Sequence, residues 1–350
     1  MKPEWFNAPC APINQQIFNA ARARQQSLTK PEGALGELES IAIRLAAMQG
    51  KAFPSVDQAS ILVFAADHGI ANESVSAYPQ AVTAEMVRNF SRGGAAISVL
   101  AKEVGAHFQV VNLGTVDKLE KLKHVTDARL SSGTVNFMHA PAMSEIQFVQ
   151  ASEYARQAVE RVLEQRSEIF IGGEMGIANT TSATALACAL LSVDPEAITG
   201  PGTGLDYTGV KRKAVKIRQA LSYHQSYLNT PVNILQRLGG FEIVALTAAF
   251  VRCAQKGVPV LVDGFIASVA ALAAERICPG ASVWFFFGHR SAEPGHQIVL
   301  EALEARPLLD LKMRLGEGSG AALALPVLRM ACALHNNMAT FYQAGVSDKS

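Results

Sequence analysis

The chain has 350 residues, of which 49% are hydrophobic and 17% are charged. This length fits one large α/β domain with an accessory piece, or two domains. The formal net charge is +1 and no long basic run occurs, so nucleic acid and anionic membrane surfaces are not expected partners and small-molecule chemistry is the default.

The five cysteines are widely spaced and odd in number, which argues against a disulfide framework or a CxxC metal site. We expect reduced thiols in a cytoplasmic protein. The first residues lack the apolar core of a signal peptide, and the most apolar tract, 258–277, is interrupted by Asp263, Glu275 and Arg276. No membrane span is therefore predicted.

The first fifty residues carry helical patterns at 14–26 and 35–48, separated by a turn at 30–33. The first strand is predicted at 59–66, where a continuous apolar run is typical of a strand buried on both faces of a parallel sheet. A helix follows from about Thr83, and a second apolar helix reaches Ala101.

Further strands are predicted at 107–113, 168–172, 258–262 and 282–287, with helical patterns between them. Alternating strands and helices predict right-handed βαβ units, and hence an α/β fold with a doubly wound, mainly parallel, Rossmann-like sheet. From residue 300 onward the pattern is helical, with no further strand expected. We therefore predict an α/β catalytic domain at 55–300 and a small helical subdomain, built from 1–50 plus 301–350, that completes the site.

Each predicted strand runs, at its carboxyl end, into polar or glycine-rich residues. These strand ends are 67–69, 112–114, 173–174, 263–264 and 288–291. In open parallel sheets the ligand crevice lies outside the carboxyl ends of the strands. The sequence therefore predicts a site assembled from these segments.

The segment 171–182 leads from a strand, through glycines, into a helix whose first turn is rich in hydroxyl groups. Free N–H groups and the helix dipole at such a place can hold a phosphate, although the same hydroxyls can simply cap the helix. Neither a P-loop nor a GxGxxG fingerprint is present, which disfavours ATP and NAD.

A second anion-site candidate is the glycine loop 200–206, which is followed by a basic run at 211–216. The loop and its cations can grip a phosphate or carboxylate, or the cations can form a solvated helix face.

Neither a metal site nor a nucleophilic triad is expected, because no HExxH spacing, no GxSxG elbow and no activated cysteine context occurs. The side chains that could be considered as metal ligands are His68, His289, His296, Asp67, Asp263 and Glu293.

The segment 315–320 places Glu317 between Gly316 and Gly318, so the backbone there can adopt positive φ and approach a bound molecule closely. The run 321–330 has helical spacing, which puts Glu317 near a helix N-terminus, where a negative charge is stabilised. By itself this pattern fits either a positioned base or an acid in an N-capping surface turn.

Together these motifs closely resemble, along nearly the whole chain, the nicotinate-nucleotide–dimethylbenzimidazole phosphoribosyltransferase family. The motifs that carry the resemblance are 30–36, 66–69, 75–80, 133–137, 173–177 with 179–182, 262–265, 289–296 and 315–320. The resemblance implies that nicotinate mononucleotide and 5,6-dimethylbenzimidazole react to give α-ribazole 5′-phosphate and nicotinate, in cobalamin nucleotide-loop biosynthesis. It also implies a homodimer that uses neither a metal nor a redox cofactor.

By this resemblance, Glu317 is the general base that takes the proton of the benzimidazole, and Glu174 is a second carboxylate that assists or orients. The expected nucleotide and phosphate ligands are Gly173, Gly176, Asn179, Thr180, Ser182, Gly202, Thr203, Gly204, Lys213, Asp263 and Ser291. The expected lining of the slot for the aromatic base is Ser76, Tyr78, Gln80, Met86 and Leu315.

Two positions depart from the family pattern. Ala178 stands where glycine is expected, and Pro201 stands where arginine is frequent. Both changes concern nucleotide affinity rather than the type of reaction. The alternatives left open are a nucleoside phosphorylase or hydrolase, a non-catalytic nucleotide sensor, and an aromatic base other than dimethylbenzimidazole.

Overall fold

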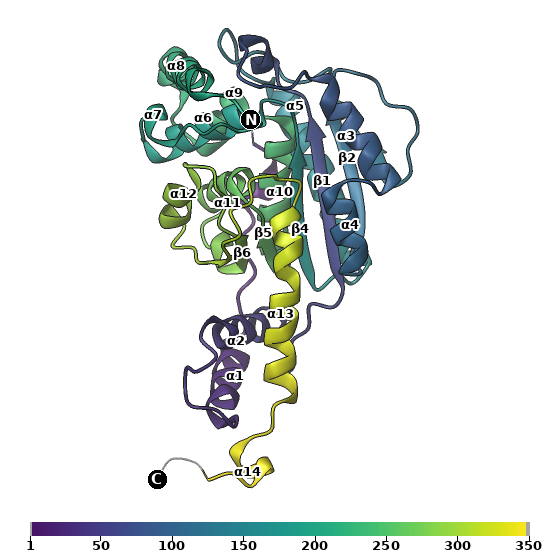
Figure 1. Ribbon diagram of the computed structural model, residues 1–350, viewed down its shortest axis with the longest axis vertical. Coiled ribbons are helices and arrows are strands. Elements are labelled where there is room, and N and C mark those ends of the chain that lie inside the picture. The colour runs from purple at the N-terminus through teal and green to yellow at the C-terminus, as the bar shows by residue number, and fades with distance from the viewer. Residues whose placement is uncertain (1, 348–350) are drawn as a thin grey trace.

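The fold is organised around an all-parallel sheet with strand order β3-β2-β1-β4-β5-β6-β7, seen in a computed structural model that describes residues 2–347 (Figure 1). The strands are β1 (Ala59–Ala66), β2 (His107–Gly114), β3 (Val125–Asp127), β4 (Ile169–Met175), β5 (Val260–Val262), β6 (Phe285–His289) and β7 (Pro307–Leu309). The chain winds outward in one direction from β1 to β3 and in the other from β4 to β7. This confirms the doubly wound Rossmann-like prediction and puts the switch point between β1 and β4.

Strand β1 lies at the centre of the sheet and is buried along its whole length, as its continuous apolar sequence predicts. It pairs with β2 on one side and with β4 on the other, so that Val63 lies opposite both Val110 and Gly173. Because both edges and both faces are covered, no position of β1 alternates toward solvent.

Helices cover both faces of the sheet. Helices α3, α4 and α13 pack on one face, and α5, α10 and α11 pack on the other (Figure 1). The helices are α1 (Gln15–Ser27), α2 (Glu37–Gln49), α3 (Ala81–Arg92), α4 (Ala96–Glu103), α5 (Glu145–Glu164), α6 (Asn179–Leu191), α7 (Pro195–Ile198), α8 (Tyr207–His224), α9 (Pro231–Leu238), α10 (Phe241–Lys256), α11 (Phe265–Ile277), α12 (His296–Ala302), α13 (Ser319–Asn337) and α14 (Phe341–Ala344). Short 3₁₀ turns occur at Glu4–Asn7, Gly69–Glu73, Gln225–Tyr227 and Ala281–Trp284.

The structure corrects three strand predictions. The strand expected at 282–287 begins later, because a 3₁₀ turn occupies Ala281–Trp284 and the Glu275 carboxylate accepts the backbone N–H groups of Gly280 and Ser282. The expectation of no strand after residue 300 is wrong, since β7 adds a three-residue edge strand beside β6. Strand β3, at the other edge, was also not predicted, because three residues are too few to show a pattern.

The two ends of the chain meet along α13. The side chain of Arg24, on α1, donates to the carbonyl oxygens of His335 and Asn336, and Leu28 pairs with Thr340 in an isolated bridge. Figure 1 shows α1, α2 and the second half of α13 extending together away from the sheet. The division into 55–300 and 1–50 plus 301–350 stays a prediction, and its residues 1 and 348–350 lie outside the described part of the chain.

All five cysteines are free thiols. Within residues 2–347, no helix combines the length and the apolar character that crossing a membrane requires.

Candidate active site

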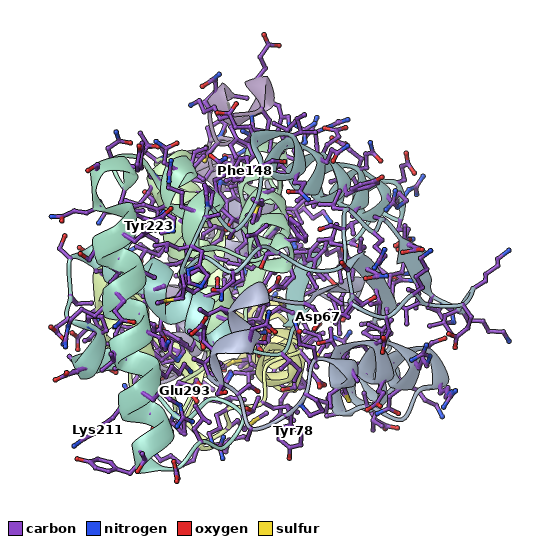
Figure 2. All side chains as sticks on the ribbon, turned by 90° about the horizontal axis from the view of Figure 1, so that it is seen from above. Asp67, Tyr78, Phe148, Lys211, Tyr223 and Glu293 are labelled. Carbon is purple, nitrogen blue, oxygen red and sulfur yellow. The ribbon has the colours of Figure 1, made fainter. Side chains whose placement is uncertain are left out.

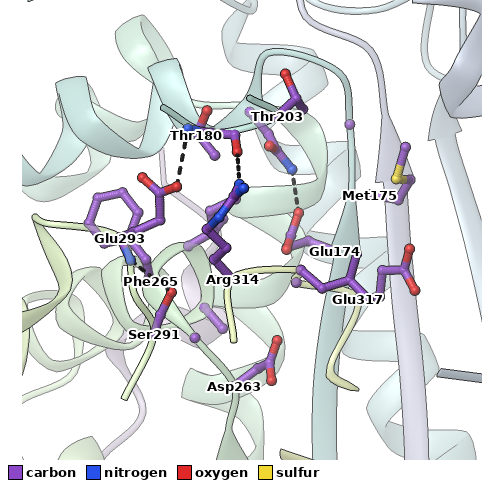
Figure 3. A pocket seen from close by; sticks show the side chains of 18 of the residues that line it. Glu174, Met175, Thr180, Thr203, Asp263, Phe265, Ser291, Glu293, Arg314 and Glu317 are labelled. Carbon is purple, nitrogen blue, oxygen red and sulfur yellow. Dashed lines mark hydrogen bonds between the residues drawn. The ribbon is translucent and has the colours of Figure 1, made fainter. Parts of the chain in front are cut away.

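A pocket of about 440 Å³ opens at the carboxyl ends of the central strands. Its walls come from residues that follow β1, β4, β5 and β6, and from the loop that precedes α13 (Figure 3). The pocket therefore lies across the switch point between β1 and β4, where open α/β sheets bind their ligands.

The loop that carries Glu317 has an unusual backbone. Gly316, Glu317 and Gly318 have φ values of 87°, 64° and 85°, so three consecutive residues are left-handed. For the non-glycine residue Glu317 this conformation costs roughly 1–2 kcal/mol. Such strain persists only where surrounding structure enforces it, and it is concentrated at functional sites.

Glu317 is not an acid in a surface turn. Its side chain is 5% exposed, and α13 is capped by the backbone of Gly318 without a side-chain hydrogen bond. The capping-turn interpretation is therefore wrong, although the predicted position just before a helix is confirmed.

The Glu317 carboxyl group lies in a largely apolar part of the pocket and extends toward Met175 (Figure 3). Burial raises the pKa of Glu317 to about 7, the backbone N–H of Ile97 opposes that rise, and the negative charge of Asp263 adds to it. Its Oε2 atom has no hydrogen-bond partner among the described residues. A carboxyl group that titrates near neutral pH and keeps a free oxygen is suited to accept a proton.

Glu174 stands at the end of β4, in the middle of the pocket. Its carboxyl group accepts hydrogen bonds from the side-chain amide of Asn179 and from the backbone N–H of Glu317. Burial raises the pKa of Glu174 well above its ordinary value, and the charges of Glu242, Asp263 and Glu317 add to the rise. The protonated form of Glu174 is thereby favoured.

The start of α6 forms the opposite side of the pocket. The hydroxyl of Thr180 faces the pocket and accepts a hydrogen bond from Lys213 Nζ at 2.8 Å. Lys213 also lies 3.3 Å from the Gly200 carbonyl oxygen, and its burial lowers its pKa to about 8, while the nearby Glu293 charge opposes that fall. Lys213 therefore sits behind Thr180, as a cation one layer below the surface of the pocket.

The glycine loop after α7 is held from two sides. Glu293 Oε1 accepts the backbone N–H of Gly202 at 3.1 Å, and Arg314 Nη1 donates to the Gly202 carbonyl oxygen at 2.8 Å (Figure 3). Arg314 lines the pocket, so it brings a guanidinium group to the loop in which Pro201 replaces a frequent arginine.

The basic run on α8 is divided between two environments. Lys213 is buried, whereas Lys211 points outward from α8 and lies 4.4 Å from the Tyr207 ring (Figure 2). Lys216 pairs with Glu73 at 2.6 Å. Apart from Lys213, the cations named here thus belong to a solvated helix face.

Most of the predicted site residues line this one pocket. They are Glu174, Glu317, Gly176, Asn179, Thr180, Gly202, Thr203, Asp263, Ser291, Tyr78, Met86 and Leu315.

The other predicted site residues do not line it, and each has a structural reason. Ser182 donates to the Leu238 carbonyl oxygen, Gln80 donates to the His68 carbonyl oxygen, and Ser76 pairs with Thr203. Gly173 lies directly beneath the backbone of Glu317, where a Cβ atom would clash. Gly204 lies in the loop beyond Thr203, and Lys213 lies behind Thr180.

The sequence did not single out several lining residues. These are Val82, Phe265, Ile266, Glu293 and Arg314 as pocket groups. Arg314 directly precedes the Glu317 loop, and Glu293 follows β6, so position next to a strand-end motif was the available signal.

Two of the residues considered as metal ligands, His68 and His296, have partners in the protein interior. His68 pairs with Glu242 at 2.6 Å, with both side chains fully buried, and His296 contacts Ser268 at 2.9 Å. Across residues 2–347, no group of three or more His, Cys, Asp or Glu side chains is arranged to hold a metal ion.

A doubly wound sheet whose switch-point pocket joins a hydroxyl-rich helix start to a buried carboxyl group is the architecture of an α/β enzyme suited to an anionic ligand and a proton transfer. The comparisons agree, because residues 10–346 match the model of a family described as phosphoribosyltransferase. The chain belongs to the nicotinate-nucleotide–dimethylbenzimidazole phosphoribosyltransferase family.

Two relatives and one solved structure illustrate the similarity. The nicotinate-nucleotide–dimethylbenzimidazole phosphoribosyltransferase of Pseudomonas aeruginosa PAO1 is 55% identical over 349 residues, which cover 100% of this chain and 99% of the relative. The enzyme of the same name from Pseudomonas putida W619 is 52% identical over the same share of both chains. The crystal structure of CobT from Thermus thermophilus is 42% identical and superposes with a TM-score of 0.92, covering 95% of this chain and 100% of that one.

Proposed function

We propose that the protein transfers the phosphoribosyl group of nicotinate mononucleotide to 5,6-dimethylbenzimidazole, with inversion at C1, in cobalamin nucleotide-loop biosynthesis. The products are α-ribazole 5′-phosphate and nicotinate. The single observation that carries this proposal is the buried Glu317 carboxyl group, which faces an apolar slot at one end of a pocket whose other end is built for an anion.

In the proposed reaction Glu317 takes the N–H proton of the benzimidazole, and the other ring nitrogen attacks C1 of the ribose. The C1–N bond to nicotinate breaks as the new C1–N bond forms, and its electron pair neutralises the pyridinium ring. Attack from the face opposite nicotinate converts a β-nucleotide into an α-riboside. Holding both rings about one carbon atom supplies much of the rate.

The two acids have different tasks in this scheme. The Glu317 side chain approaches the substrate, whereas Glu174 keeps the backbone of Glu317 in place through its N–H group. Because protonation of Glu174 is favoured, its carboxyl group can also donate a hydrogen bond to an oxygen atom of the ribose without repelling the anionic nucleotide. Glu174 thus assists and orients.

The nucleotide phosphate is assigned to the side of the pocket formed by Asn179, Thr180, Thr203 and Ser291, with Arg314 beside it. The amino end of α6 has no side-chain cap, so its helix dipole is open to an anion there, and Lys213 adds positive charge from behind Thr180. Arg314 thereby compensates for the arginine that is absent at Pro201.

The aromatic base is assigned to the slot beside α3 and β4. Tyr78, Val82, Met86, Met175 and Leu315 give it flat, apolar walls. Apolar walls reject related rings only weakly, so purines and other benzimidazoles are candidate substrates as well.

We infer a cytoplasmic homodimer. Among the described residues before 51, none lines the pocket of its own chain, although the small helical subdomain was predicted to complete the site. The second half of that predicted subdomain supplies Arg314 to Glu317 to the pocket of its own chain, so in the proposed dimer only the half before residue 51 would act through a partner copy. Sedimentation of the purified protein tests this directly, with a monomer at assay concentration contradicting it.

The experiment for the reaction uses purified protein with nicotinate mononucleotide, with and without 5,6-dimethylbenzimidazole. We expect α-ribazole 5′-phosphate only with the base, and slow release of nicotinate without it. Equal release without the base, or release that depends on inorganic phosphate, would support a hydrolase or phosphorylase. Binding without any product would support a nucleotide sensor.

A further inference from the structure

Asp263 follows β5, and its carboxylate is engaged by the loop that carries Glu317. The backbone N–H of Gly318 donates to Asp263 Oδ2 at 3.1 Å, and the N–H of Ala321 donates to Oδ1 at 2.8 Å. The side chain is 2% exposed. Both oxygens thus accept hydrogen bonds from the backbone at the start of α13, whereas the family resemblance implies a nucleotide ligand at Asp263.

The loop needs such an attachment because its backbone is strained. Residues 316–318 are all left-handed, and the chain passes so close to β4 that any side chain at Gly173 would clash with the Glu317 carbonyl group. Glu174 holds the loop from the β4 side through the N–H of Glu317, and Asp263 holds it from the β5 side. Two acids from neighbouring strands therefore fix the residue between them.

His289 restrains Asp263 in turn. Its Nε2 atom lies 3.5 Å from Asp263 Oδ1, and its ring is 2% exposed. The His289 ring packs against the backbone of Gly264 and Gly320, where a Cβ atom at either position would come too close to the ring. Asp263 thus lies between the buried His289 ring and the Glu317 loop.

We propose that Asp263 is a positioning residue, which acts on the reaction by holding Glu317 within reach of the benzimidazole nitrogen. The inference rests on the proposed function, in which Glu317 is the base. The groups that face Glu317 are the carboxyl groups of Glu174 and Asp263 and the backbone N–H of Ile97 at the amino end of α4.

The decisive experiment is a double-mutant cycle of Asp263→Asn and Glu317→Gln. The asparagine keeps the shape of the side chain, but its amide nitrogen meets a backbone N–H group and the negative charge is lost. Alone, D263N should lower kcat on the order of 10²-fold, as expected for a displaced catalytic group, and leave KM for nicotinate mononucleotide within about 3-fold. In the E317Q background it should lower kcat no further, because the group it positions is already absent.

The pH profile gives an independent readout. The Asp263 charge adds to the rise in the pKa of Glu317, so D263N should move the acid limb of kcat/KM to lower pH. A purely structural loss of stability would not move that limb.

Glu168→Gln is the matched control. Glu168 Oε2 also accepts two backbone N–H groups, from Asp57 at 3.1 Å and Gln58 at 3.3 Å. Glu168 lies at the amino ends of the strands, directly before β4 and on the side of the sheet opposite the pocket. E168Q should lower the melting temperature without changing kcat or its pH profile.

The inference is overturned if D263N raises KM with kcat preserved, which would mark a nucleotide ligand, or if D263N and E317Q reduce kcat independently. If D263N does not fold, His289→Gln carries the same test, with a smaller loss of kcat at constant KM expected and an unchanged kcat as the contrary result. Absence of α-ribazole 5′-phosphate with the unmodified protein would instead refute the proposed function.

Discussion

The guanidinium group of Arg314 donates to the carbonyl oxygen of Gly202 at 2.8 Å. This bond joins two segments that are far apart in sequence: the residues just before the Glu317 loop and the glycine loop at 200–204. It gives the pocket an arginine at the loop where Pro201 stands, and it links that glycine loop to the Glu317 loop.

Arg314→Met should weaken binding of nicotinate mononucleotide by about 10- to 100-fold, since a charge-assisted hydrogen bond contributes roughly 1.5–3 kcal/mol. Nicotinate riboside lacks the phosphate, so its binding should change little. Calorimetric titration with both ligands measures the difference. Lys312→Met is the control, because Lys312 pairs with Asp310 at 2.9 Å on the surface. Equal losses for both ligands would mean that Arg314 contacts a part of the nucleotide other than its phosphate.

Glu317→Gln should lower kcat by about 10²- to 10⁴-fold, the usual contribution of a positioned general base. The amide keeps the shape of the side chain but cannot accept the benzimidazole proton. Binding of nicotinate mononucleotide should be retained, as measured by titration in the absence of the aromatic base. Wild-type turnover in E317Q would rule out the assigned role.

The pH dependence of kcat/KM should show an acid limb near pH 7. Burial raises the pKa of Glu317 to about 7, and the carboxyl group must be ionised to take a proton. Activity should therefore fall about 10-fold per unit as the pH drops below this value. Initial rates at low substrate concentration measure the limb, and an acid limb centred near pH 4.5 would contradict a buried base.

Glu317→Gln should also stabilise the protein above neutral pH. The folded-state pKa of about 7 lies above the ordinary value of 4.5, so between these values the folded state binds more protons than the unfolded state. The free energy of unfolding therefore falls as the pH rises through this window, by roughly 3 kcal/mol. Urea denaturation should find E317Q more stable than wild type at pH 8 and closer to it at pH 4.5. A destabilised E317Q at pH 8 would contradict this account.

Ala178→Gly should stabilise the protein by up to about 1 kcal/mol. Ala178 has a φ of 75° at the start of α6, a conformation that costs alanine more than glycine, although the unfolded chain gains freedom. Its methyl group is buried and does not line the pocket, so nucleotide affinity should hardly change. Urea denaturation and titration measure the two effects. Ala183→Gly, inside the same helix, should instead destabilise by about 1 kcal/mol.

The central strand was predictable from sequence, whereas the edges were not. β1 occupies the predicted residues 59–66, because burial on both faces leaves a continuous apolar run. The apolar run at 282–287 looked the same, but its first half is a 3₁₀ turn fixed by Glu275 through tertiary hydrogen bonds. Short edge strands such as β7 carry too few residues for a pattern.

Some residues of the site could likewise be predicted from sequence, whereas others could not. Glu317 could be found because flanking glycines are a local signal for a constrained backbone, and the family resemblance supplied its role. Ser182 and Gln80 belong to other motifs of the same resemblance, yet their side chains donate to backbone carbonyl groups, and sequence alone does not give the direction of a side chain. Arg314 carried no signal of its own, because its partner at Gly202 is brought to it by folding.

Helix α13 starts two residues after Glu317 and runs for 19 residues, roughly 28 Å. Near its far end, Asn336 bonds to the Pro54 carbonyl oxygen ahead of β1, and Arg24 of α1 bonds to the carbonyls of His335 and Asn336. The same helix therefore connects the loop of Glu317 with the contacts of the terminal helices. Because α13 packs on the sheet between these two ends, the Glu317 loop and the terminal helices share one fixed support.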